Sequence, residues 1–351
     1  MLSPAYKITF ASPPGGGLLG TASAVVPGSG GSARVIDTTE DAQASTIIDL
    51  QVMMDMDVAA NQYSLKMGQV GGFRPAHGGE ITIELGYAEE DELVQVMKGA
   101  SETVRPALGI RQVTGYCAAT TLMRTRMDET FESKSAGDIV QTLADEAGVA
   151  VADVESGINF PAYVIDGRRN AYQHMQALAD LCGFDVYLNH ENELVFKKFN
   201  NGETIHIFDY AQHVLTLQVS QVKPKYQQTK VFGESPAGSE SAEAWGWLTK
   251  DFSGSKGSAG SDEPAKLVEN PALRTGQGAQ AAADAALLAI QRDSLQGQLT
   301  VLGNPAIKLG DAVRLREVPE EPLNGTFQVR SVTHRITKKS GFITTVGFRS
   351  I

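Results

Sequence analysis

Two stretches of the sequence, residues 81–104 and 307–332, follow the same order of apolar, glycine and acidic positions. Each reads as a strand, a glycine, a strand, an acidic turn, an apolar-X-Gly step and a last strand. Alternation with a period of two places apolar side chains on one face of a strand, and a glycine inside it marks a sharp bend. The repetition predicts two similar, tube-like β-barrel modules far apart in the chain. Neither stretch contains a nucleophile, a metal cluster or a phosphate loop, so the repeat indicates architecture.

The length and composition fit a multi-domain protein rich in strands. A chain of 351 residues can form two to four domains with substantial cores. Its 36 glycines suit turns and bulges better than long helices. We therefore expect a β-rich α+β protein.

The charge of the chain restricts its partners. The formal net charge is -11, and the lysines and arginines are scattered, whereas a nucleic-acid clamp needs them clustered. We expect no specific nucleic-acid binding. The acidic balance leaves open a surface that nucleic acid slides past, or plain solubility.

Two further features bear on the compartment. The only cysteines, Cys117 and Cys182, are few enough for a reducing compartment, and we read both as small buried hydrophobes. No apolar run approaches the roughly 18 residues that span a bilayer. The start of the chain lacks the pattern of a secretory signal. We expect no membrane insertion.

The middle of the chain has a helical period. Ser135 is placed to cap a helix that ends at Gly148, and Asn170 to cap a second helix that ends at Gly183. Residues 184–196 then read as a hairpin. This pattern predicts a small α+β domain inserted between the barrels.

These patterns give expected domain bounds. We place the first barrel at residues 1–116, the insert at 117–202, the second barrel at 203–233 and 295–351, and an extended excursion plus a helix at 234–294. Ser, Gly, Ala and acidic residues dominate Glu234 to Glu263. Its large apolar side chains either dock onto a neighbouring chain or pack on the parent domain; they are Trp245, Trp247, Leu248 and Phe252.

The residues that could carry chemistry form no known constellation. The histidines lack the i, i+4 spacing of a helical zinc pair; they are His77, His174, His190, His206, His213 and His334. Acidic clusters such as Glu89 to Glu92 lie in predicted turns, and no Gly-X-Ser-X-Gly elbow joins a strand to a helix. We predict no catalytic residue, no metal site and no cofactor.

An ordered set of short motifs along most of the chain resembles the phage late control protein D family. That family comprises the tail hubs of contractile phages and related injection machines. The segments that carry the resemblance lie at 81–99, 113–148, 175–196 and 303–344. The positions that match as structural positions are Gly86, Tyr87, Gly99, Phe131, Gly148, Gly183, Gly310, Asp311, Gly325 and His334.

The resemblance implies a non-enzymatic baseplate hub. It would be a homotrimer whose six barrel modules join a sixfold inner tube to a threefold spike, with the α+β insert toward the spike and an acidic lumen. The implied partners are further copies of the chain, the inner tube protein, a spike protein and, as an additional candidate, the tape-measure protein. Such a protein is made in the bacterial cytoplasm and assembled into a phage tail or injection particle.

Two points qualify that expectation. The sequence ends at Ile351 without the further barrel and β-helix of fused spike proteins, so we expect a separate spike polypeptide. Two other classes stay open from the residues alone: a cell-wall hydrolase carried by such a device, and a free carbohydrate-binding β-protein.

Overall fold

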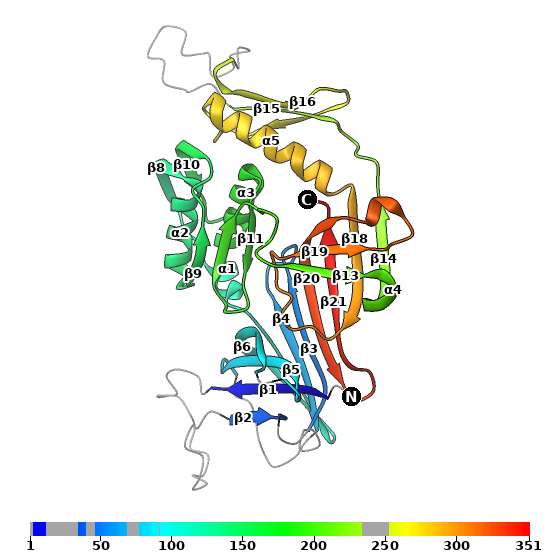
Figure 1. Ribbon diagram of the computed structural model, residues 1–351. Helices are drawn as coiled ribbons and strands as arrows, with labels where there is room; N and C mark the ends of the chain where they lie inside the picture. Colours follow the sequence, from blue (N-terminus) through cyan, green and yellow to red (C-terminus); the bar gives the residue numbers. More distant parts are fainter. Residues whose placement is uncertain (1–2, 12–33, 40–45, 69–76, 91, 234–252) are drawn as a thin grey trace, which may run out of the picture.

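A computed structural model describes residues 3–11, 34–39, 46–68, 77–90, 92–233 and 253–351. Strands dominate; the helices within residues 119–182 lie together on one side of the molecule, the helix at 276–292 lies across the top of the view, and a short helix at 210–213 lies on the other side (Figure 1). The expected β-rich α+β class is confirmed.

Two sets of strands form the body of the molecule. Module 1 comprises β1 (Pro4–Phe10), β2 (Arg34–Asp37), β3 (Ile47–Asp55), β4 (Gln62–Gly68), β5 (Glu80–Tyr87), β6 (Val94–Ala107) and β7 (Ile110–Tyr116). Module 2 comprises β13 (Ile205–Asp209), β14 (Val214–Gln221), β18 (Leu295–Leu302), β19 (Ala312–Arg316), β20 (Thr326–Thr337) and β21 (Gly341–Arg349), with the short α4 (Tyr210–His213) and the 3-10 turn η3 (Glu321–Leu323).

The two modules share one sheet. Its thirteen strands include the run β14-β18-β21-β20-β3-β4-β7-β6, in which every neighbouring pair is antiparallel. The modules meet where β20 pairs with β3 through seven residue pairs, from Ser331↔Asp55 to Thr337↔Asp49. We call this pairing the seam. In Figure 1 the long strands β3, β4, β20 and β21 lie side by side, and β1 and β2 run across their ends. Whether each module closes as a barrel stays a prediction.

The modules have the same internal order. Module 1 runs β3-β4-β7-β6-β5 and module 2 runs β14-β18-β21-β20-β19. Equivalent strands carry equivalent core pairs. Leu50 pairs with Leu65 as Leu217 pairs with Leu299. Val104 pairs with Val113 as Val332 pairs with Val346.

Irregularities in the ladders also coincide. The register shifts at Ile47/Asp49 in β3 and at Val214/Thr216 in β14, which are matching places. It shifts again at Ser101/Thr103 in β6 and at Val329/Ser331 in β20, which match as well. Because bulges are specific features of a strand pairing, their coincidence shows that the modules are structural duplicates.

The sequence repeat identified the duplication but aligned it inaccurately. Gly99 lies inside β6, whereas Gly325 precedes β20. The strand pairing matches Gly99 with Phe327. Loops of different length between β5 and β6 and between β19 and β20 shift the acidic turns, so motif spacing alone misplaces the match.

The predicted helical insert is present. It comprises α1 (Ala119–Arg124), β8 (Glu129–Ser135), α2 (Ala136–Ala147), β9 (Val151–Val154), β10 (Asn159–Ile165), α3 (Ala171–Cys182), β11 (Asp185–Leu188) and β12 (Leu194–Lys197). Ser135 and Asn170 form capping boxes at the starts of α2 and α3, and Gly148 and Gly183 end these helices with left-handed backbones, as predicted. Cys117 is buried and Cys182 half-buried, and both are free thiols.

Residues 228–292, which lie between β14 and β18 of module 2 in the sequence, fold into a separate layer. Strand β15 (Gln228–Phe232) lies between β16 (Lys256–Gly260) and β17 (Ala265–Glu269), and α5 (Gly276–Arg292) packs on β15 and β16 beside the short turn η2 (Ser253–Ser255). The predicted excursion thus contains two strands beside the predicted helix. Its apolar residues Trp245, Trp247, Leu248 and Phe252 lie outside the described residues. The domain bounds given above remain predictions.

His334 occupies the core side of the seam. It is fully buried in β20, opposite Val52 of β3 and Thr344 of β21. Its Nδ1 lies 3.0 Å from the Thr344 hydroxyl oxygen, and its Nε2 has no hydrogen-bond partner. Burial lowers the pKa of His334 to about 3, so the folded protein holds this ring neutral.

We predict that stability falls in mild acid because of His334. An unfolded chain protonates a histidine near its ordinary pKa of about 6.5, whereas the fold resists this until about pH 3, so the unfolded state gains up to about 1.4 kcal/mol per pH unit between these values. Urea unfolding from pH 7 to pH 4 should show a shallower fall for His334→Gln. The exposed His77→Gln provides the control. An equal change of slope in both variants would contradict the prediction.

Candidate assembly edges and domain junction

The eight-strand run ends in two strand edges that have a neighbour on one side only within the described part of the chain. Strand β14 pairs with β18 alone. Strand β6 pairs with β5 through residues 94–100 and with β7 through residues 100–107, so its second half has one neighbour. Unpaired edges present backbone donors and acceptors to another strand.

Core residues at the two free edges are less buried than their counterparts in the seam, as the missing neighbouring strand predicts. Leu50 and Val52, in the seam, are fully buried, whereas their counterparts Leu217 and Val219 in β14 are half-buried. Val332 is fully buried, whereas its counterpart Val104 in β6 is half-buried. Each edge therefore exposes core positions that the seam covers in the other module.

Large apolar side chains lie exposed next to both edges. Leu215 of β14 is 55% exposed and Val222, just after that strand, is 58% exposed. Leu108, at the tip of the β6–β7 turn, is completely exposed. Isolated exposed leucines are ordinary, but here they flank two unpaired edges.

The second face of the eight-strand run, which we call the polar face, carries mostly neutral side chains. One row crosses it strand by strand, and the two central threonine hydroxyls of that row, on Thr300 and Thr345, lie 3.2 Å apart. The row consists of Thr216, Thr300, Thr345, Thr333, Met53, Gln62 and Tyr116. Charged groups on this face lie toward its ends and include Asp49, Asp55, Lys66, Arg105, Arg335 and Arg349, and Arg335 pairs with Asp49 at 2.8 Å.

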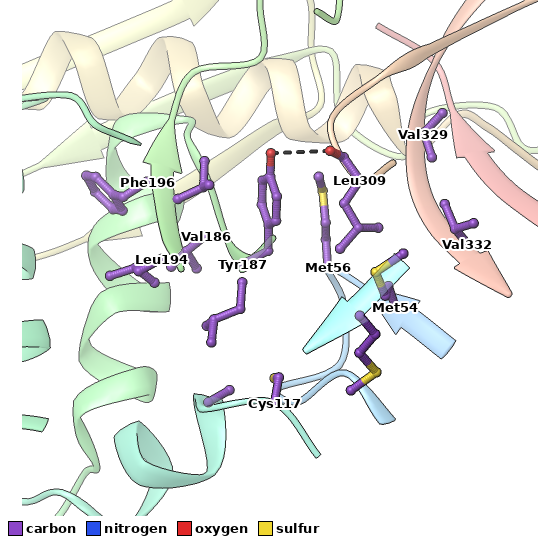
Figure 2. Packing of buried hydrophobic residues seen from close by; sticks show 14 of the residues in the cluster. Met54, Met56, Cys117, Val186, Tyr187, Leu194, Phe196, Leu309, Val329 and Val332 are labelled. Atoms are coloured by element: carbon purple, nitrogen blue, oxygen red, sulfur yellow. Dashed lines mark hydrogen bonds between the residues drawn. The ribbon is translucent and has the colours of Figure 1, made fainter. Parts of the chain in front are cut away.

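The insert packs against both modules. In Figure 2 the Tyr187 hydroxyl donates to the Leu309 carbonyl, at 3.4 Å, and Met56 lies beside this contact. On the opposite end of the sheet, the Tyr87 hydroxyl of module 1 donates to the Gly303 carbonyl of module 2 at 2.9 Å. Buried tyrosines therefore hold the three parts together at separate points.

Four charged residues meet where the three parts join, and we call them the junction charge cluster. Arg330 of β20 donates to Asp185 of β11 at 2.5 Å and pairs with Asp57, which follows β3. Arg349 of β21 reaches the same Asp185 at 3.3 Å. Gln328 donates to the other Asp185 oxygen at 2.5 Å. Asp185 thus receives donors from two strands of module 2.

Electrostatics within this cluster are uneven. The nearby carboxylates of Asp185 and Asp57 raise the pKa of Arg330 in spite of its burial. Burial, together with the charge of Arg330, lowers the pKa of Arg349. The guanidinium groups of Arg330 and Arg349 and the carboxylate of Asp185 are largely shielded from water. A buried pair of this kind is costly to break.

The family-motif positions are spread over the fold and do not form one site. Gly310 has φ +84°, and a Cβ there would lie 2.5 Å from the Tyr187 hydroxyl, so this glycine permits the contact with the insert. Asp311 accepts from the Lys308 amide and faces His206, both at 2.9 Å. Gly86 is the next-to-last residue of β5, and Gly99 lies in β6, where a Cβ would meet the Tyr116 carbonyl at 2.6 Å. Phe131 is buried in β8.

Sequence reasoning missed the junction charge cluster. Its members come from three distant segments, and each is an isolated charged residue in its own segment, so no local pattern marks them. Within the described residues no group of three or more His, Cys, Asp or Glu side chains is arranged to hold a metal ion. No helix there is long and apolar enough to cross a membrane.

Comparison with known proteins gives a family and a fold. Residues 42–338 match the family model of the Alg8 N-terminal domain. No curated protein matches the sequence.

Solved structures share the fold over almost the whole chain. The 43 kDa tail protein of prophage MuSo2 from Shewanella oneidensis is 12% identical, with a TM-score of 0.69 over 99% of this chain and 98% of that chain. A tail protein from Neisseria meningitidis MC58 is 12% identical, with a TM-score of 0.67 over 99% and 97%. The E. coli c3393 protein, a type VI secretion component, is 8% identical, with a TM-score of 0.55 over 88% and 74%.

We predict that the junction charge cluster behaves as a coupled unit. Arg330→Ala should lower the free energy of unfolding by about 3–5 kcal/mol, because Asp185 stays buried with a weaker partner. Asp185→Ala should lower the free energy of unfolding less in the Arg330→Ala background than in the unmodified protein, because in that background it removes an uncompensated carboxylate. Denaturant unfolding of the two single variants and the double variant measures this coupling. Strictly additive losses would show that the residues act independently.

Proposed function

We propose that this chain, which belongs to the Alg8 N-terminal domain family, is a structural baseplate hub of a contractile tail or phage-like injection system. In this role a homotrimer couples a sixfold inner tube to a threefold spike. The fold shared with phage tail proteins and with a type VI secretion component supports the proposal. The late control D resemblance supports the finer assignment to a hub.

One observation carries the proposal: duplicate modules lie side by side in one sheet. Three copies would supply six equivalent modules, which is how a threefold assembly presents sixfold geometry to a tube. The seam already joins two modules within one chain. The free edges of β6 and β14 are the duplicates of the two strands that form it.

The seam therefore provides a template for the contact between copies. Strand directions alternate along the eight-strand run, so β14 of a second copy would lie antiparallel to β6 of the first. In the seam Thr333 faces Met53. Their duplicates are Arg105 and Ser220. The predicted contact places Arg105 of one copy opposite Ser220 of the next, both on the polar face.

One residue distinguishes this contact from the seam. Pro106 stands in β6 where His334 stands in β20, and proline has no backbone N–H to donate. The edge of β6 therefore has one backbone donor fewer than β20, and a contact between copies that needed this donor would be weaker than the seam. With such an edge, copies of the isolated chain would associate weakly, and partner proteins would be needed to stabilise the assembly.

In a closed ring the polar face would form the wall of the pore. Its central rows are amide and hydroxyl side chains, with opposite charges toward the ends. The proposed wall is thus mostly neutral along its central rows, and the acidic lumen expected above stays a prediction. Neutral, hydroxyl-rich walls attract neither nucleic acid nor protein strongly, which suits a conduit.

The remaining expectations follow from the same role. The partners would be other copies of the chain, the inner tube protein, the spike protein and the tape-measure protein. The insert would face the spike, the protein would be made in the bacterial cytoplasm and assembled into the particle, and it would carry no catalytic activity.

We predict that engineered cysteines at Arg105 and Ser220 join copies of the chain into closed trimers. Directly opposed residues on antiparallel strands have Cβ atoms about 4.5–5.5 Å apart, close enough for a disulfide after small adjustments. Under mild oxidation, with the tube and spike proteins present, Arg105→Cys/Ser220→Cys should run at three times the 37.4 kDa of one chain on a non-reducing gel.

The matched control moves one cysteine by one residue. In Arg105→Cys/Gln221→Cys the second thiol points to the other face of the sheet, so crosslinking should be largely lost. Light scattering of the unmodified protein with both partners should show the same trimer. A protein that stays monomeric with the tube and spike, or crosslinks equally well in both variants, refutes the proposed ring.

A further inference from the structure

We propose that Arg292, at the end of α5, is the receptor for a small oxyanion, a carboxylate or a phosphate, in a cavity between α3, α5 and the end of the sheet. Arg292 is 5% exposed. Its Nε has no hydrogen-bond partner, and within the described residues no carboxylate pairs with its guanidinium. The guanidinium instead makes a cation–π contact with Phe199, whose ring centroid lies 5.9 Å from the Arg292 Cζ.

The surroundings leave this cation uncompensated. Arg292, Arg330 and Arg349 line the same cavity. The one buried carboxylate among them, Asp185, is already bonded to Arg330 and Arg349. Asp57, with its side chain 66% exposed, pairs with Arg330. Three guanidiniums therefore share one buried and one exposed carboxylate.

Two further carboxylates on the cavity wall do not change this balance. Asp180 of α3 is exposed, so water screens its charge, and the charge of Lys266 acts on it as well. Asp293 is exposed to solvent and forms no hydrogen bond or ion pair with Arg292. Lys266 of β17 adds another positive charge at the wall. Burial lowers the pKa of Arg292, and the charge of Arg330 lowers it too, whereas Asp185 acts in the opposite direction without reversing the shift.

The cavity can accept the missing anion. Its volume is about 580 Å³, within the range of small-ligand sites, and it is open to solvent. A guanidinium binds carboxylates and phosphates through parallel N–H donors, and Arg292 is among the residues that line the cavity. The same chemistry can come from a free oxyanion in solution or from a glutamate side chain of a partner polypeptide.

The test follows the Nε–H resonance of Arg292 by NMR in the full-length protein. Inorganic phosphate and a capped triglutamate peptide are added separately at constant ionic strength. We expect one or both to shift this resonance saturably, and ligand at 100 times its Kd to raise the folding equilibrium constant about 100-fold. A shift with the peptide alone identifies a partner side chain as the source, and a shift with phosphate identifies a free oxyanion.

Variants separate a built site from general charge attraction. Arg292→Met should weaken binding at least tenfold, whereas Arg316→Met, which removes an exposed arginine on β19, should leave it unchanged. If Arg292→Met does not fold, Arg292→Lys serves, because it keeps the charge but loses the parallel donors. No shift with either probe, or equal binding by the Arg292 variants and Arg316→Met, overturns the proposal.

Discussion

The pairing of β20 with β3 is the interaction on which the rest of the structure depends. It joins the last long strands of the chain to the first ones, and so turns two duplicated modules into one continuous sheet. The pairing covers Leu50, Val52 and Val332 completely, whereas their duplicates at the free edges stay half-buried. One physical event therefore accounts for the core at the centre of the sheet and for the unsatisfied edges at its ends.

The insert depends on the seam as well. Asp57 follows β3, Arg330 precedes the paired part of β20, and Asp185 belongs to the insert, so the three meet only when the seam has formed. The same corner contains Arg292, which is buried without a carboxylate of its own. The joint between the modules thus fixes the insert in place and creates a cationic cavity beside it.

The sequence predicted what local patterns encode. Ser135 and Asn170 cap their helices as expected because a capping box needs only residues three positions apart. Alternation predicted strands and therefore the β-rich class. It could not predict which strands pair, since β20 and β3 show the same alternation as strands that do not meet. The junction charge cluster was invisible for the same reason, because single charged residues in distant segments carry no pattern.

The duplication shows the limit of motif reading most clearly. The matching bulges and the shared Leu-Gln-Val triplets, Leu50 to Val52 and Leu217 to Val219, define the true alignment. A triplet is too short to notice among so many aliphatic residues, whereas the acidic turns are conspicuous but fall in loops of unequal length. Structure recovers the alignment because backbone pairing, unlike motif spacing, fixes each residue to one partner.

Electron cryomicroscopy of the chain assembled with the proposed tube and spike partners tests the central claim most directly. The account predicts a ring of three copies in which β6 of each copy lies hydrogen-bonded to β14 of the next, with the polar face toward the pore. A ring in which these two edges face solvent, or in which the two modules stack along the pore axis, would contradict it.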